Sequence, residues 1–131
     1  MNLDGDVAVR FDHVSKSIGA TRILEDVSFE IPRGTAFAIL GRRGTGKTIA
    51  LKLSIGLLKP DRGRIFINQE EITTLDALGL RRVRKSTGFV FQNSAIFDSI
   101  SVAENIAFPL RYNSGSRKVK FRKKSISSFF K

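Results

Sequence analysis

The chain has 131 residues, no cysteine, a single histidine and a formal net charge of +11. The lack of cysteine excludes disulfides, cysteine metal sites and thiol catalysis, and one histidine is too few for a histidine metal cluster. An apolar fraction of 41% is compatible with one globular domain of modest size rather than with a disordered chain.

The first third of the chain predicts an antiparallel β layer. Residues 7–14 alternate apolar and polar side chains, as a strand with one solvated face does. Residues 23–31 show the same alternation, and the turn residues 32–34 close the second strand. His13 falls in the first of these strands, where we expect an ordinary strand or loop residue rather than a metal ligand.

The next two segments predict a buried strand followed by a helix. Residues 35–40 form a short apolar run between two glycines, which is typical of a buried parallel strand. Residues 48–58 are apolar at most positions, as in a helix that is buried on most sides, and Pro60 cannot continue it.

The remaining elements are short. After a turn at 59–63, residues 64–68 predict a strand, and Thr74–Asp76 can cap a short helix that runs through Arg84. Residues 87–92 predict another buried strand. Ser101 and Glu104 have the spacing of a capping box, which predicts the start of a further helix.

The segment between the predicted strand 35–40 and the following helix fits the phosphate-binding pattern G-x-x-x-x-G-K-S/T at every fixed position. Its glycines allow the backbone to wrap around phosphate oxygens, and successive N–H groups then form an anion nest. The ammonium group would attract the β- and γ-phosphates, and the threonine hydroxyl would be a ligand for Mg²⁺. The alternative is an ordinary glycine-rich turn, which the order of strand, loop and helix disfavours. The eight residues are Gly41, Arg42, Arg43, Gly44, Thr45, Gly46, Lys47 and Thr48.

Four segments in this order resemble the first half of an ABC-transporter ATPase. They are residues 27–34, the phosphate loop, residues 56–65, and Phe89–Gln92, which matches the glutamine loop of that family. Residues 91–110 are closer still to the Mla- and Mce-type lipid-transport ATPases. The resemblance covers roughly Val7 to Arg111. It implies an α/β P-loop NTPase core of the ABC type, truncated, with an antiparallel β layer at its N-terminus.

The resemblance also implies roles for matching residues. Gly41–Thr48 would hold the triphosphate of ATP, and Thr48 and Gln92 would meet Mg²⁺. Gln92 would also meet the attacking water and couple the site to a transmembrane permease, which would dock near the residues that follow it. A second ATP-binding subunit would complete a dimer. Without the resemblance, Gln92 is simply a solvated residue at a strand end.

Three features depart from the family pattern. Members usually stack an aromatic ring on the adenine near the end of the first strand, where this chain has Ile18; an aliphatic side chain covers a base but forgoes stacking, worth on the order of 1 kcal/mol or more. Arg42 and Arg43 stand where the family commonly has Pro and Ser; we expect Arg42 in solvent and leave Arg43 open. The signature, Walker B and switch-histidine motifs are absent from the 131 residues. We therefore expect weak Mg-ATP binding with little or no hydrolysis, and we assign no catalytic residue.

Residues 112–131 differ from the rest, with seven Lys and Arg and no acidic residue. We expect a partial ABC ATP-binding domain at 1–111 and a basic tail at 112–131 that is disordered or loosely helical. Two alternatives stay open: a tail that binds nucleic acid or an anionic membrane, although we expect no nucleic-acid partner, and a non-hydrolytic stub that occupies the permease. With no apolar run near ~18 residues and no basic N-terminal signal, we expect a cytoplasmic protein, peripheral on the cytoplasmic face of the inner or plasma membrane.

Overall fold

The computed structural model describes residues 7–91 and 96–114, and it describes side chains as far as residue 108. The chain divides into two compact units, one ending at Gly88 and the other beginning at Phe89. None of the helices in the described ranges combines the length and apolar character that a membrane span requires. Each unit is described by itself below.

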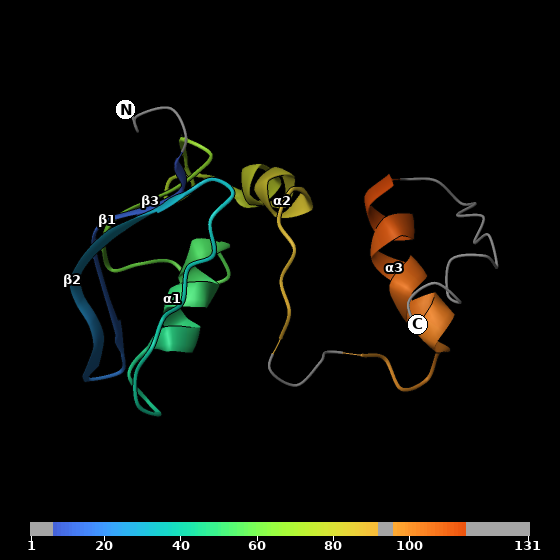
Figure 1. Cartoon of the computed structure of the whole chain (residues 1–131), viewed down its shortest axis with the longest axis horizontal. Coiled ribbons are helices and arrows are strands. Elements are labelled where there is room, and N and C mark those ends of the chain that lie inside the picture. The colour runs from blue at the N-terminus through green and yellow to red at the C-terminus, as the bar shows by residue number, and fades with distance from the viewer. Residues whose placement is uncertain (1–6, 92–95, 115–131) are drawn as a thin grey trace. The chain divides into compact units, whose positions relative to one another are not determined.

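The first unit is built on a four-stranded sheet. Strands β1 (Val7–Ile18) and β2 (Thr21–Pro32) form an antiparallel hairpin, and β3 (Arg62–Ile67) pairs with the other edge of β1. The short β4 (Glu70–Glu71) follows, so the order is β2-β1-β3-β4 with antiparallel neighbours (Figure 1). The predicted antiparallel layer is confirmed, and β1 runs four residues beyond its predicted end.

Helix α1 (Lys47–Ser54) is shorter than the predicted helix at 48–58, and the expectation that Pro60 stops it was wrong. Gly56 adopts a left-handed conformation with φ of 65°. Its N–H donates to the carbonyl of Leu53 at 3.0 Å, and the N–H of Leu57 donates to the carbonyl of Lys52 at 2.9 Å. A glycine therefore ends the helix, because it takes the left-handed conformation without a Cβ penalty.

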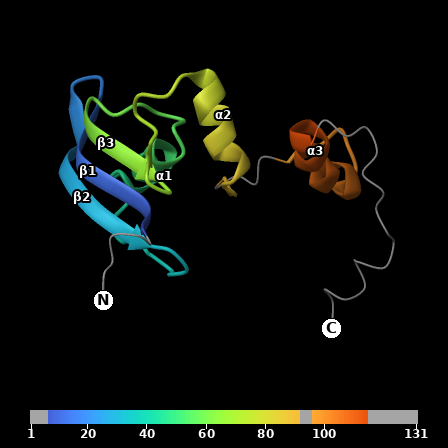
Figure 2. The same cartoon turned by 90° about the horizontal axis from the view of Figure 1, so that it is seen from above.

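Helix α2 (Ala77–Lys85) begins where the sequence predicts it. The carboxylate of Asp76 accepts a hydrogen bond from the N–H of Gly79 at 2.8 Å, which satisfies one of the free donors at the helix start. The helices α1 and α2 lie on the same side of the sheet (Figure 2). The core fills this space, with Phe11, Val14, Leu53 and Ile65 fully buried and Ile67, Ile72 and Val83 around them.

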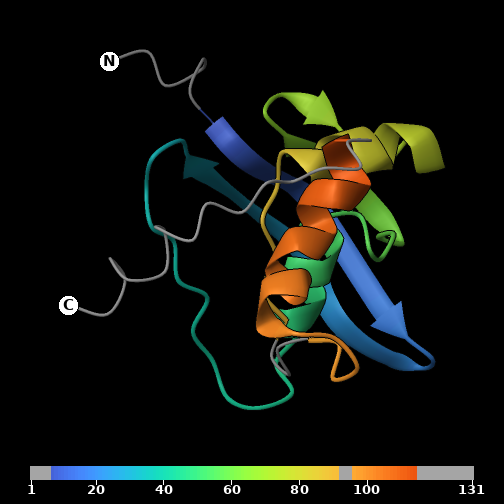
Figure 3. The same ribbon diagram turned by 90° about the vertical axis from the view of Figure 1, so that its right-hand side faces the viewer.

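The buried parallel strand predicted at 35–40 does not form, and neither does the buried strand predicted at 87–92 over its described residues. Residues 35–40 run as an unpaired loop between β2 and α1 (Figure 3), with Phe37 49% and Leu40 90% exposed. Residues 87–91 likewise form no strand, and Val90 is 92% exposed. A parallel strand is stable when it has hydrogen-bonded neighbours and cover on both faces. In the described part of the chain no strand pairs with either segment. Their apolar sequences are therefore not enough to make them strands.

The second unit contains α3 (Val102–Ser114), and its predicted capping box is confirmed. The N–H of Glu104 donates to the hydroxyl of Ser101 at 3.3 Å, and the N–H of Ser101 donates to the carboxylate of Glu104 at 3.0 Å. The side chain of Asn105 also binds both backbone groups of Phe97, at 2.8 and 3.0 Å, which holds the preceding loop on the helix. Helix α3 extends into the segment 112–131, the rest of which lies outside the described residues.

A bulge in β1 is packed closely against the start of β3. His13 has a φ of 51°, and the pairing register shifts around it toward both β2 and β3. Gly63, at the start of β3 with a φ of 84°, packs against this bulge: a Cβ at position 63 would lie 2.3 Å from the carbonyl oxygen of His13. Only a glycine allows β3 to approach so closely.

We therefore expect Gly63→Ala to lower the free energy of unfolding by roughly 3 kcal/mol or more, because it adds a clash with backbone atoms to left-handed strain. Gly19→Ala is the matched control: Gly19 also has a positive φ, of 58°, but nothing lies within 4 Å of its added Cβ. The control should cost about 1 kcal/mol. Urea unfolding followed by circular dichroism measures both, and equal losses would contradict the packing argument.

The same bulge carries an ion pair that depends on pH. Nδ1 of His13 lies 2.7 Å from the carboxylate of Asp26, and this hydrogen bond, with the negative charge of Asp26 and Asp12, raises the pKa of His13 above its ordinary 6.5 despite nearby Arg64. Its contribution to stability is complete below pH 6.5 and is lost as pH rises through the raised pKa. The urea midpoints of wild type and Asp26→Asn should therefore differ more at pH 5.5 than at pH 8.5. An equal difference at both pH values would sink this assignment.

Candidate nucleotide-binding site

The phosphate loop turns back on itself before α1. Gly44 and Gly46 have φ values of 85° and 87°, in the left-handed region that favours glycine. The turn is closed by Thr45, whose hydroxyl donates to the carbonyl of Arg42 at 2.9 Å. A Cβ at Gly41 would lie 2.7 Å from that same hydroxyl. The glycines of the motif therefore allow the backbone to make this turn, where other residues would be strained or would clash.

Lys47 holds the two ends of the loop together. It is the first residue of α1, and its ammonium group donates to the carbonyl oxygens of Gly41 at 2.8 Å and Arg42 at 2.6 Å. Both acceptors are neutral carbonyl oxygens, so they leave the positive charge of Lys47 uncancelled. The charge thus lies inside the turn where the motif predicts phosphate oxygens.

The start of α1 adds to this positive site. Its N-cap is Gly46, which has no side chain to satisfy the free N–H groups, and the first turn has no acidic residue. Free N–H groups and the helix dipole favour an anion at this end. Thr48 is exposed in the same first turn, so its hydroxyl is available as an oxygen ligand for Mg²⁺. The donor set fits Mg-ATP.

The β1–β2 hairpin touches the loop. A Cβ at Gly46 would lie 2.8 Å from Cγ2 of Ile23 and 3.1 Å from Cδ2 of Leu24, so the start of β2 packs directly on the N-cap. Ile18, which is 51% exposed, pairs with Thr21 at the closed end of the same hairpin. Ile18 therefore lies on the same hairpin that contacts the phosphate loop. Gln92 lies outside the described residues.

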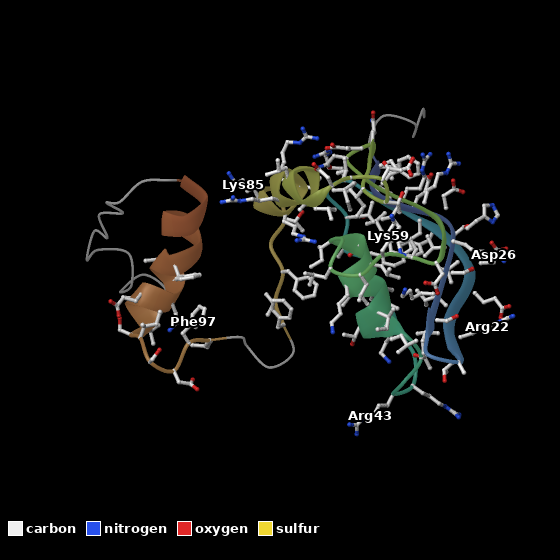
Figure 4. All side chains as sticks on the ribbon, turned by 180° about the vertical axis from the view of Figure 1, so that it is seen from behind. Arg22, Asp26, Arg43, Lys59, Lys85 and Phe97 are labelled. Atoms are coloured by element: carbon white, nitrogen blue, oxygen red, sulfur yellow. The ribbon has the colours of Figure 1, made fainter. Side chains whose placement is uncertain are left out.

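Arg42 and Arg43 are both exposed, and Arg43 projects from the tip of the loop (Figure 4).

Two other residues support the site, and the sequence did not single them out. The carboxylate of Asp61 binds Lys16 at 2.7 Å and the N–H of Ser17 at 2.6 Å, which lowers the pKa of Asp61 and ties the end of β1 to the turn before β3. Arg84 donates to the carbonyl of Ile55 at 2.9 Å, just beyond the end of α1.

These two supports join residues that lie 29 or more positions apart in the sequence. No local pattern carries such contacts. The one available signal for Asp61 is its place in a turn, which is typical of aspartate and says nothing about its partner.

A family profile described as ABC transporter matches residues 24–129, most of the chain. The chain belongs to the ABC transporter family. It is 40% identical over 116 residues to a probable ribonucleotide transport ATP-binding protein of Mycobacterium leprae, a match that covers 88% of this chain and 33% of that protein. It is 42% identical over 111 residues to the chloroplastic protein trigalactosyldiacylglycerol 3 of Arabidopsis thaliana, covering 82% and 31%. The chain thus spans about a third of the length of these curated relatives.

Solved structures of ABC cassettes share the fold. The dimeric post-hydrolysis state of the ATP-binding cassette MJ0796, bound to ADP and Pi, matches with a TM-score of 0.75 and 28% identity over 86% of this chain and 50% of that one. CbiO1 from Clostridium perfringens, part of the complex cbiONQ, matches with a TM-score of 0.72 and 28% identity over 88% and 45%. The predicted fold class, an ABC-type P-loop NTPase with an antiparallel β layer, is confirmed.

Proposed function

We propose that the chain binds Mg-ATP through Gly41–Thr48 as the ATP-binding part of an ABC transporter. The observation that carries this proposal is the position of Lys47. Its ammonium group lies 2.8 Å from the carbonyl oxygen of Gly41 and 2.6 Å from that of Arg42, and these neutral groups leave its charge uncancelled. Two left-handed glycines and the uncapped start of α1 surround that charge with backbone donors. ABC ATPase domains in general bind ATP with Mg²⁺, and this geometry suits the same ligand.

For the metal, we assign Thr48 as a ligand, since its hydroxyl stands exposed in the first turn of α1. Gln92 is the second proposed ligand, on the resemblance of Phe89–Gln92 to the glutamine loop of the family. When bound, the ion would neutralise phosphate charge and draw the β- and γ-phosphates toward the loop.

The proposed cargo is lipid. The resemblance of residues 91–110 to Mla- and Mce-type ATPases supports it, as does a relative named after a galactolipid. Other relatives carry the names of ribonucleotide, methionine and spermidine or putrescine transport, and these are the competing cargo classes. Complementation of a host that lacks its own phospholipid-transport ATPase, compared with one that lacks methionine import, separates lipid from methionine.

The proposed partners are a second ATP-binding subunit and a transmembrane permease, which would place the chain on the cytoplasmic face of a membrane. ABC ATPases dimerise and pair with permeases, and the MJ0796 cassette was solved as a dimer. In the second unit, Ile96, Phe97 and Ile106 are 60%, 50% and 55% exposed. Such apolar exposure next to the segment that follows Gln92 supports a permease docking surface there.

Replacing Lys47 tests the proposed function. Lys47→Ala should weaken Mg-ATP binding by roughly ten- to a hundredfold, because it removes a charge-assisted hydrogen bond to phosphate worth about 1.5–3 kcal/mol. Isothermal titration calorimetry measures the affinity, and Lys52→Ala, at the opposite end of α1, is the matched control that should bind like wild type. Equal affinities for Lys47→Ala and wild type, with melting curves that show both to be folded, would refute the proposal.

A further inference from the structure

Two arginines of the phosphate loop, like Arg62 but unlike most arginines in the described part of the chain, have side chains without a partner. Many arginines there are engaged: Arg22 binds Glu25 at 2.6 Å, Arg64 binds Asp12 at 2.6 Å, Arg82 pairs with Glu70, and Arg10 stacks over the ring of Phe66 at 4.1 Å. Within residues 7–91 and 96–108, the guanidinium groups of Arg42 and Arg43 make no ion pair or hydrogen bond.

The sequence around the loop offers them no local partner either. Between Glu30 and Asp61 there is no acidic residue, whereas six positions are Lys or Arg. Three of these charges, on Arg42, Arg43 and Lys47, lie in the loop itself, in the six-residue stretch 42–47. At physiological salt the Debye length is about 8 Å, so charges on the loop act on an anion seated in it even without direct contact.

The surface beside the loop, by contrast, offers little to a base. The hairpin touches Gly46 through the aliphatic side chains of Ile23 and Leu24, and its closed end exposes Ile18. Residues 15–25 contain no aromatic side chain, so a base lying there would find no ring to stack on. Aliphatic contact covers any base equally, because it makes no hydrogen bond to the edge that distinguishes one base from another.

We propose that this site selects its ligand by the polyphosphate chain and not by the base, so that GTP, UTP and inorganic tripolyphosphate bind about as well as ATP. This inference rests on the proposed function, since it concerns the same loop. Arg42 and Arg43 add attraction for a highly charged anion, while the hairpin contributes only non-selective cover. Affinity should therefore fall with the number of phosphates, from ATP through ADP to AMP, more steeply than it changes with the base.

Calorimetric titration with the magnesium forms of ATP, GTP, UTP and tripolyphosphate, at two salt concentrations, tests this inference. We expect the four affinities to agree within about threefold. The double variant Arg42→Ala/Arg43→Ala should bind all four about tenfold more weakly, with a shallower salt dependence. The matched control removes two charges elsewhere: Lys59→Ala/Lys85→Ala lies away from the loop tip in Figure 4 and should bind like wild type.

A ring added to the hairpin tests the other half. Ile18→Tyr should tighten ATP and GTP about fivefold through stacking and leave tripolyphosphate unchanged, while Ala20→Tyr, in the adjacent turn, should change neither. ATP binding at least tenfold tighter than GTP, UTP and tripolyphosphate in wild type would overturn the inference and leave Mg-ATP binding intact. An arginine double variant that matches its lysine control would also overturn it. If no compound binds folded protein, the proposed function itself falls.

Discussion

The burial of Leu53 against one face of the sheet is the constraint on which the site depends. Leu53 comes from α1, and its fully buried neighbours Phe11, Val14 and Ile65 come from β1 and β3. This contact fixes α1, and α1 in turn fixes Gly46 and Lys47, which close the loop at its start. The segment before the loop is held less firmly: of residues 35–40, Phe37 stacks on Phe29 at 5.2 Å, while Leu40, next to the loop, is 90% exposed. The loop therefore joins a well-packed helix to a poorly packed lead-in.

This asymmetry explains why Lys47 matters before any ligand arrives. Its two hydrogen bonds to Gly41 and Arg42 link the firmly held side of the loop to the loosely held side. A bound phosphate would share the same ammonium group, and the backbone donors of α1 would be free to meet it. Structural closure and the proposed anion attraction would thus come from one side chain, whereas the guanidinium groups of Arg42 and Arg43 would add charge alone.

The sequence predicted the elements whose signals are local. Asp76 at the start of α2 and the Ser101–Glu104 pair at the start of α3 each act within one helical turn, so their spacing is enough. The turn at 41–48 depends on equally local contacts, because its glycines and lysine act within eight residues, while its binding of a nucleotide stays a prediction. The strands predicted at 35–40 and 87–92 do not form over their described residues, because a buried strand depends on neighbouring strands that no sequence window contains. The ties made by Asp61 and Arg84 were missed for the same reason.

Residues 35–40 have a further consequence for the fate of the chain in a cell. An extended apolar stretch without backbone partners is what chaperones bind and what proteases cleave, since both act on unpaired, accessible chain. Here the stretch is accessible in the folded unit, so recognition does not have to wait for unfolding. The half-life of the chain would then depend on how quickly another polypeptide covers Phe37 to Leu40. Chaperones and proteases would compete with that polypeptide for the same residues.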